Sequence, residues 1–238
     1  MKQNNEPHLI AALGICKRFH VGSSTLKILE NIDLRLHRGE FVAIMGPSGS
    51  GKTTLLHILG CLERPSSGSY RLNGVDIIAA SDDDLSHIRA NKIGFIFQTF
   101  NLLPGLTVYE NIEAPFLYRS CEHLQIKEKI MDSIAQVGLG ERVKHKPSEL
   151  SGGEMQRVAI ARAICADPLL VLADEPTGNL DSGTGLEILK IFKKLHAGGA
   201  AIVMVTHDRN VASVADRIIY LKDGRRVDEA SASKQQAV

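Results

Sequence analysis

A glycine-rich segment near residue 50 has the residue types and the spacing to hold a phosphate chain. It reads G-P-S-G-S-G-K-T and fits the pattern G-x-x-x-x-G-K-[ST] at each fixed position. Glycines let backbone N–H groups turn toward phosphates, and the N-terminus of a following helix adds positive charge. The lysine can contact the β and γ phosphates, and the hydroxyl after it can ligate magnesium. A glycine loop that only turns a strand into a helix is the alternative. We expect nucleotide binding by Gly46, Pro47, Ser48, Gly49, Ser50, Gly51, Lys52, Thr53 and Thr54.

Two acidic residues, Asp174 and Glu175, follow the apolar run at residues 169–173. At the carboxyl end of a buried strand, Asp174 can hold magnesium directly or through water. In an extended chain Glu175 points to the opposite side, so that it is free to orient and activate a water molecule. The alternative is that both carboxylates cap a helix. A phosphate loop in the same chain favours the metal and catalytic roles.

The segment L-S-G-G-E at residues 150–154 precedes a helical stretch and has the features of a second anion site. It combines a hydroxyl, two glycines that expose N–H groups, and a helix N-terminus. A capping box between Ser151 and Glu154 explains those two residues by local hydrogen bonds. It does not require Gly152 and Gly153, because glycine weakens a helix. The double glycine therefore favours a functional role.

The elements that must position these residues follow from the apolar pattern. Short apolar or alternating runs predict strands, at residues 9–19, 28–36, 40–45, 69–72, 92–98, 169–173 and 200–205, with a final hairpin at 218–228. Helices are expected after the phosphate loop, near the acidic run 81–84, and at 185–195. That acidic run is interpreted as a solvated helix cap, with metal binding as the alternative. Buried strands that alternate with helices predict a parallel sheet covered on both faces.

The middle of the chain has a different character. From residue 107 to 166 the apolar residues recur at helical spacing, with breaks at Pro115, Gly138 and Pro147. We therefore predict an α/β chain with a P-loop NTPase core and a mostly parallel sheet. An antiparallel β region lies at its N-terminus, and a helical subdomain is inserted at about residues 99–165. The catalytic core takes about 9–98 and 166–230 of a single domain, 1–238.

Composition excludes several classes of protein. The chain has 238 residues and no tryptophan. Its 44% of hydrophobic residues argues against disorder, and its formal charge of +1 argues against binding to nucleic acid by net charge. Its longest apolar run has six residues, at 200–205, whereas a transmembrane helix needs about 20. The first ten residues lack the pattern of a secretory signal. Reduced thiols are expected because no C-x-x-C pair occurs among Cys16, Cys61, Cys121 and Cys165.

Taken together, the motifs resemble those of the ATP-binding cassette (ABC) ATPases. The phosphate loop, L-S-G-G-E-M-Q-R, L-A-D-E-P and Thr206-His207-Asp208 occur in that family's order and approximate spacing. The resemblance covers about residues 9–228. It implies that Ser151, Gly152, Gly153 and Glu154 contact the γ-phosphate bound to a second copy, so that two chains sandwich two ATP molecules.

The resemblance also implies roles for single residues. Gln98 matches the glutamine that reaches magnesium or the attacking water and couples the site to a membrane partner. His207 matches the histidine that contacts the γ-phosphate and positions Glu175, and Asp181 belongs to a loop that crosses the dimer interface. Phe19 takes the place of an aromatic residue, commonly Tyr, that stacks on adenine, although it also fits the core of a strand. The implied catalytic residues are Glu175, His207, Lys52 and Gln98, and the implied ligands of Mg²⁺ are Thr53, Gln98 and Asp174.

The longer sequence around these motifs is similar to ATPases of the lipoprotein and macrolide exporter group. The resemblance implies ATP hydrolysis that drives integral membrane permease subunits with large extracytoplasmic domains. It places the chain as a peripheral protein on the cytoplasmic face of the inner membrane, with no nucleic acid partner. Met155 and Thr53 depart mildly from the pattern without removing a chemical group. A cell-division ABC ATPase that regulates cell-wall enzymes shares D-E-P-T-G-N-L-D, and a non-transport ABC ATPase is a further alternative.

Overall fold

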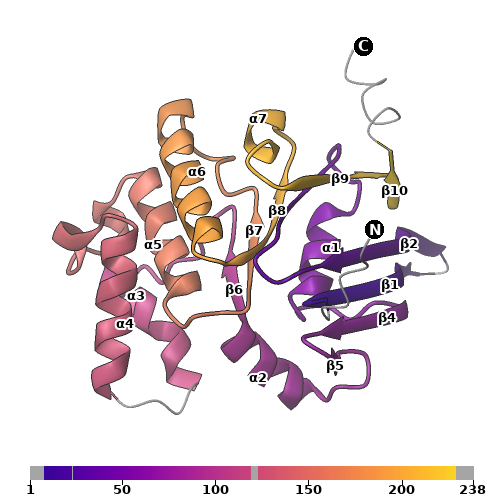
Figure 1. Ribbon diagram of the computed structural model, residues 1–238, viewed down its shortest axis with the longest axis horizontal. Helices are drawn as coiled ribbons and strands as arrows, with labels where there is room; N and C mark the ends of the chain where they lie inside the picture. The colour runs from indigo at the N-terminus through magenta and orange to yellow at the C-terminus, as the bar shows by residue number, and fades with distance from the viewer. Residues whose placement is uncertain (1–7, 23, 119–122, 229–238) are drawn as a thin grey trace, which may run out of the picture.

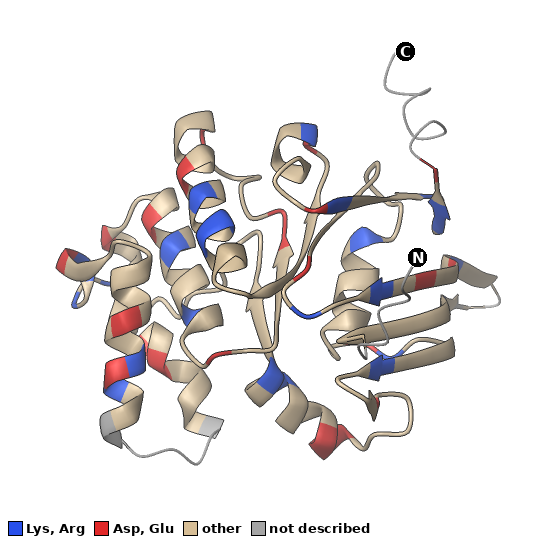
Figure 2. Cartoon of the chain, viewed as in Figure 1, with Lys and Arg blue, Asp and Glu red and all other residues tan. Residues whose placement is uncertain are grey.

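Two β-sheets and a set of helices make up the computed structural model of the chain, which describes residues 8–22, 24–118 and 123–228. A six-stranded sheet has the order β10-β9-β3-β8-β7-β6, and a four-stranded antiparallel sheet has the order β2-β1-β4-β5 (Figure 1). Basic and acidic residues are interspersed along the chain (Figure 2). The predicted α/β fold class, with an antiparallel region near the N-terminus, is confirmed.

The six-stranded sheet is parallel except at one edge. Its parallel strands are β3 (Phe41–Met45), β6 (Ile93–Ile96), β7 (Leu170–Asp174), β8 (Ala201–Thr206) and β9 (Arg217–Lys222), and β10 (Arg225–Val227) runs antiparallel to β9. Every residue of β3 and β8 is buried. Continuous apolar sequence is what such strands require, because both faces of the sheet are covered.

Different elements cover the two faces of this sheet. On one face, α1 (Lys52–Leu59) packs together with the antiparallel sheet. That sheet consists of β1 (Ile10–Val21), β2 (Ser24–Leu36), β4 (Ser67–Leu72) and β5 (Val75–Asp76). On the other face lie α5 (Gly152–Ile164) and α6 (Ser182–Ala197). The short helix α7 (Arg209–Ala212) contacts β3 and β8.

A helical region separates β6 from β7 along the chain and lies to one side in Figure 1. It contains α3 (Val108–Glu113), α4 (His123–Gln136), α5 and the 3₁₀ turns Ala114–Tyr118, Gly140–Arg142 and Pro147–Glu149. The buried amide of Asn111 holds its entry loop by donating to the carbonyls of Leu103, Leu106 and Thr107. Buried polar groups with full sets of partners fix a loop in one conformation.

Most predicted boundaries differ from the structure by one to four residues, as at β2, which starts at Ser24 instead of residue 28. Three of the differences lie at site residues or next to them. Lys92 ends helix α2 (Asp82–Lys92), and β6 stops at Ile96, so that Gln98 lies beyond the strand instead of ending it. Helix α6 starts at Ser182, three residues before the predicted start, because the carboxylate of Asp181 caps it. The acidic run caps α2 as predicted, through a capping box between Ser81 and Asp84.

Cys16 is half-buried, Cys61 and Cys165 are buried, and these three cysteines form no disulfide with one another. Cys121 lies outside the described residues. Within the part of the chain that the structure describes, no helix combines the length and hydropathy that would let it cross a bilayer.

Candidate nucleotide-binding and catalytic site

The phosphate loop joins the carboxyl end of β3 to the first turn of α1, as its sequence predicts. A Cβ atom at Gly46 would lie 2.1 Å from the carbonyl oxygen of Leu221, so only glycine fits there. Gly51 caps α1 with a φ of 96° and no side-chain hydrogen bond. The N–H groups of the first turn are therefore open to an anion, and the positive end of the helix dipole favours one.

Lys52 lies inside the loop and is only 8% exposed. Its Nζ donates to the carbonyl oxygens of Gly46 at 2.8 Å and Pro47 at 2.9 Å. Burial lowers the pKa of this amine, and the nearby carboxylates of Glu175 and Asp174 oppose that change. The ammonium group is thus held by the loop carbonyls in the centre of the expected phosphate site.

Thr53 and Asp174 form a pair of oxygen ligands at the edge of the sheet. The hydroxyl of Thr53 donates to Asp174 Oδ1 at 3.4 Å, although the residues are 121 positions apart. Burial raises the pKa of Asp174, and the Thr53 hydrogen bond partly offsets this. Hydroxyl and carboxylate oxygens are the hard ligands that Mg²⁺ prefers, so the two side chains fit such an ion.

The backbone of Glu175 is not extended. The expectation that an extended chain turns its side chain away from that of Asp174 is therefore wrong. The strand stops at Asp174, and Glu175 has a φ of 46°, with its N–H donating to the carbonyl of Val205 at 3.0 Å. Both carboxylate oxygens lie near His207 Nδ1, Oε2 at 2.7 Å and Oε1 at 2.9 Å. The Glu175 side chain is 15% exposed and the His207 side chain 67% exposed. A left-handed turn, stabilised by the neighbouring strand, therefore directs the carboxylate to the histidine.

Gln98 lies beside the loop that follows Glu175. Its backbone carbonyl accepts a hydrogen bond from Asn179 Nδ2 at 2.9 Å. Its Nε2 lies 3.2 Å from where a Cβ atom of Gly178 would be, and the N–H of Gly178 donates to the carbonyl of Glu175. The structure thus brings Gln98 next to the loop that follows Glu175.

The turn at residues 151–154 forms a capping box between Ser151 and Glu154, which is the local explanation that the sequence offered for these two residues. The hydroxyl of Ser151 accepts from the N–H of Glu154, and Glu154 Oε2 accepts from the N–H of Ser151 at 2.8 Å. Glu154 Oε1 accepts from Arg142 Nε at 2.8 Å. The Arg142 bond and the Ser151 N–H lower the pKa of Glu154 to about 2. Glu154 therefore holds the turn, and the exposed Ser151 and the backbone remain to face a ligand.

The turn and the phosphate loop of the same chain are separated by the sheet. Residues of α1 pack in the cluster on one face, and residues of α5 pack in the cluster on the other. Among the described residues, no hydrogen bond joins residues 151–154 to residues 46–53. The turn is therefore remote from the phosphate loop of its own chain.

Asp181 is the N-cap of α6. Its Oδ1 accepts from the N–H of Thr184 at 3.0 Å, and its Oδ2 accepts from the Thr184 hydroxyl at 2.6 Å. These hydrogen bonds lower the pKa of Asp181. Thr184 thereby fixes the end of the loop that contains Asn179.

Phe19 is exposed, which rules out the core alternative. Its side chain is 39% exposed, and Lys17 Nζ lies 4.8 Å from the centre of its ring. Phe19 pairs with Leu26 across the β1–β2 hairpin. Further along β2, Leu29 contacts the position of Gly51 in the phosphate loop. The ring is thus presented to solvent on the hairpin that borders this loop.

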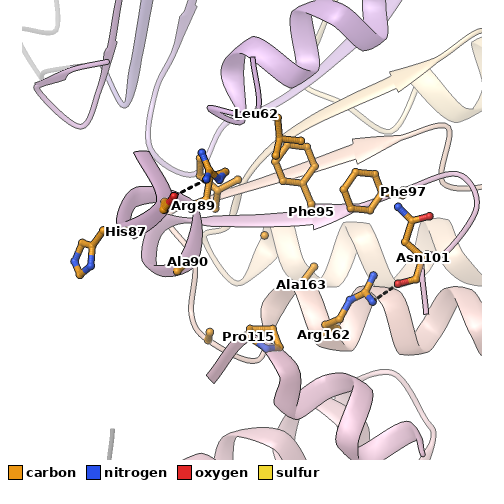
Figure 3. A pocket seen from close by; sticks show the side chains of 14 residues that line it. Leu62, His87, Arg89, Ala90, Phe95, Phe97, Asn101, Pro115, Arg162 and Ala163 are labelled. Carbon is orange, nitrogen blue, oxygen red and sulfur yellow. Dashed lines mark hydrogen bonds between the residues drawn. The ribbon is translucent and has the colours of Figure 1, made fainter. Parts of the chain in front are cut away.

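A groove of about 720 Å³ lies between α2, β6 and α5 (Figure 3), and it is lined by Phe97, the residue before Gln98. The rings of Phe95 and Phe97 stack in it, with centroids 5.2 Å apart. Arg162 lines the groove, and its guanidinium group donates to the carbonyls of Asn101 and Phe100. The groove is mostly apolar. Of the two arginines that line it, Arg162 is held by the loop that follows Gln98, and Arg89 donates to the carbonyl of Cys61.

Comparison with known proteins agrees with this geometry. The family model for ABC transporters matches residues 29–178, more than half of the chain. The uncharacterized ABC transporter ATP-binding protein YvrO of Bacillus subtilis is 48% identical over 90% of this chain and 93% of its own length. The chain is an ABC ATPase.

Among solved structures, the dimeric bacterial ABC transporter cassette MJ0796 has a TM-score of 0.85 and 43% identity, covering 92% of this chain and 97% of that one. The same cassette in a post-hydrolysis state with ADP and Pi gives a TM-score of 0.84 at 43% identity, covering 92% of this chain and 98% of that one. The macrolide export ATP-binding/permease protein MacB of Vibrio parahaemolyticus is 48% identical over 91% of this ABC ATPase, which spans 33% of that protein.

Two contacts of this ABC ATPase were not found from its sequence. Arg142 reaches Glu154 across a fold-dependent turn, and no local pattern marks it. Thr184 could have been found, because an Asp three residues before a Thr at a helix start is a capping pattern.

Proposed function

We propose that this ABC ATPase is the ATP-hydrolysing subunit of a bacterial transporter complex of the lipoprotein and macrolide exporter type. Two copies sandwich two ATP molecules, each between residues 46–53 of one chain and residues 151–154 of the other, with Asp181 at the interface. The sheet that separates these segments within one chain supports this arrangement. The dimeric cassette MJ0796 supports it independently. Phe19 stacks on the adenine ring.

The observation that carries the proposed chemistry is the contact of Glu175 with His207 beside Asp174. Glu175 orients and activates the attacking water, and His207 holds this carboxylate and contacts the γ-phosphate. Lys52 binds the β and γ phosphates, since phosphoryl transfer depends on positioning and charge compensation. Thr53, Asp174 and Gln98 would hold Mg²⁺, which adds charge compensation when bound.

Coupling to the membrane uses the groove beside Gln98. We assign residues 9–98 and 166–230 to the catalytic core and residues 99–165 to the helical subdomain, so the groove lies between them. A cytoplasmic segment of a permease with large extracytoplasmic domains fits an apolar groove of this size. The relatives in which a macrolide export permease is fused to the ATP-binding part support a membrane partner. The chain is then peripheral, on the cytoplasmic face of the inner membrane.

Glu175→Gln tests the chemistry. The variant keeps the size of the side chain and loses the charge that activates water, so ATP binds and hydrolysis falls by about a hundred- to a thousandfold. Bound ATP then persists, and size exclusion with ATP shows a dimer. Thr53 and Lys52 are untouched, so nucleotide affinity serves as the internal control. Hydrolysis at the wild-type rate would remove Glu175 from its role.

Co-purification from detergent-solubilised membranes tests the partner. An integral membrane protein with a large extracytoplasmic domain is the expected partner, and transport assays with that pair separate export from regulation of cell-wall enzymes. Recovery of nucleic acid or ribosomes without a membrane protein would instead indicate a non-transport ABC ATPase.

A further inference from the structure

Gly153 and Thr184 meet where the N-termini of α5 and α6 approach each other. A Cβ atom at Gly153 would lie 2.3 Å from Thr184 Cγ2, which is a severe steric clash between two non-bonded carbon atoms. At the neighbouring Gly152, a Cβ atom would lie 3.4 Å from Leu180 Cδ2, close to ordinary contact. The exclusion of a side chain is therefore specific to Gly153, and its source is a residue of the same chain.

Thr184 cannot turn its methyl group away at no cost. Its hydroxyl donates to Asp181 Oδ2 at 2.6 Å, and hydroxyl and methyl are both carried by Cβ. Rotation that moved the methyl away from Gly153 would therefore take the hydroxyl off Asp181. A side chain at Gly153 and the Asp181 cap of α6 thus compete for the same rotamer of Thr184.

A second contact joins the same two helices one turn further along each. Arg157 Nη1 lies 3.5 Å from Glu187 Oε2, with Arg157 20% exposed and Glu187 65% exposed. An ion pair this exposed adds little stability, so the close approach of Gly153 to Thr184 is the tighter of the two contacts.

We propose that Thr184 is a positioning residue that couples residues 151–154 to residues 179–181 within one chain. This inference rests on the proposed function, in which both segments act across the dimer. Each chain's turn then takes its position from that chain's own interface loop, so the two ATP sites of the dimer are mechanically linked through Thr184. Gly153 is small because it must accommodate the Thr184 methyl, and the nucleotide does not require it.

A double-mutant cycle tests this coupling in the Glu175→Gln background. Gly153→Ala, Thr184→Ser and the double variant are compared by the ATP concentration that gives half-maximal dimer in size exclusion. Serine keeps the hydroxyl that bonds Asp181 and removes the methyl. We expect Gly153→Ala alone to raise that ATP concentration by about tenfold or more. In the Thr184→Ser variant, the same Gly153→Ala change should raise it by less than about threefold.

Matched controls separate coupling from misfolding. Gly185 lies in the same helix as Thr184. Gly185→Ala places a Cβ atom 3.7 Å from Thr177 Cβ, an ordinary contact, and should leave dimerisation unchanged. Affinity of the monomer for a fluorescent ATP analogue should be equal in all variants. In the background that has Glu175, Gly153→Ala should raise the KM for ATP more than it lowers kcat.

Each outcome is informative. If serine at 184 does not rescue Gly153→Ala, the nucleotide rather than Thr184 requires the glycine, and the coupling is overturned. Equal dimerisation of Gly153→Ala and its parent would overturn it as well. If Glu175→Gln itself forms no dimer with ATP, the proposed function fails and the coupling falls with it.

Discussion

Glu175 and His207 meet at the edge of the sheet although they lie 32 positions apart in the chain. Glu175 follows β7, and His207 follows β8, the adjacent parallel strand. The carboxyl ends of parallel strands lie at the same edge of a sheet, so the order of these strands brings the two side chains together. His207 Nδ1 lies 2.7 Å from Glu175 Oε2. The γ-phosphate contact that we propose for His207 therefore falls to its other ring nitrogen, Nε2.

Replacing His207 with alanine should lower kcat by about a hundred- to a thousandfold, because the carboxylate of Glu175 loses the group that holds it. The KM for ATP should change much less, since the phosphate loop is intact. Steady-state hydrolysis across ATP concentrations measures both. His196→Asn is the matched control, because His196 also contacts a carboxylate, 3.1 Å away on Asp216, at the opposite end of the sheet. An unchanged kcat in His207→Ala would contradict the assignment.

The contact of Arg142 with Glu154 should stabilise the fold in a pH-dependent way. The pKa of Glu154 is lowered to about 2 in the folded chain, below an ordinary value of 4.5. A carboxyl group whose pKa is lower in the folded chain stabilises the folded state at pH values above its pKa in the unfolded chain. This contribution is lost as the pH falls from about 4.5 to 2. Arg142→Ala should therefore lower the urea midpoint at pH 7 relative to wild type, by an amount that shrinks at pH 4 and below. Arg142→Lys should recover part of the loss, and a difference independent of pH would argue against the ion pair.

Gly46→Ala should destabilise the chain far more than Gly49→Ala. Both glycines lie in the phosphate loop, but a Cβ atom at Gly46 would lie 2.1 Å from the Leu221 carbonyl, whereas nothing lies within 4 Å of one at Gly49. Gly49, with a φ of 77°, carries only the backbone strain of about 1–2 kcal/mol. We expect about 3 kcal/mol or more for Gly46→Ala. Urea unfolding without nucleotide measures both, and equal losses would show that the Leu221 carbonyl can move aside.

Phe19→Ala should weaken ATP binding by about tenfold, which is about the contribution of one aromatic stacking contact. The exposed ring contributes little to folding, so the melting temperature should stay near that of wild type. Phe19→Tyr should bind normally. Leu26→Ala is the control, because Leu26 lies opposite Phe19 on the same hairpin and is 55% exposed. If Phe19→Ala left the affinity for ATP unchanged, and ATP and GTP bound equally well both to wild type and to the variant, Phe19 would be removed from the adenine site.

The sequence by itself determined the features that depend on neighbours in the chain. The apolar runs at 40–45 and 200–205 predicted buried parallel strands because no polar residue interrupts them. The phosphate loop, the capping boxes of α2 and α5, and the final hairpin are likewise local patterns. Their boundaries were wrong by a few residues where a cap decides the end, as with Asp181 and α6.

Only the tertiary structure decided which distant residues meet. The left-handed turn of Glu175 depends on the Val205 carbonyl in the next strand, so an extended chain was the wrong expectation. The contact of Arg142 with Glu154 requires the 3₁₀ turn at Gly140–Arg142 to lie against the start of α5. The contact of Thr184 with Gly153 requires α5 and α6 to pack in one orientation. Local spacing cannot encode such contacts, because their free energy comes from close packing between elements that the fold brings together.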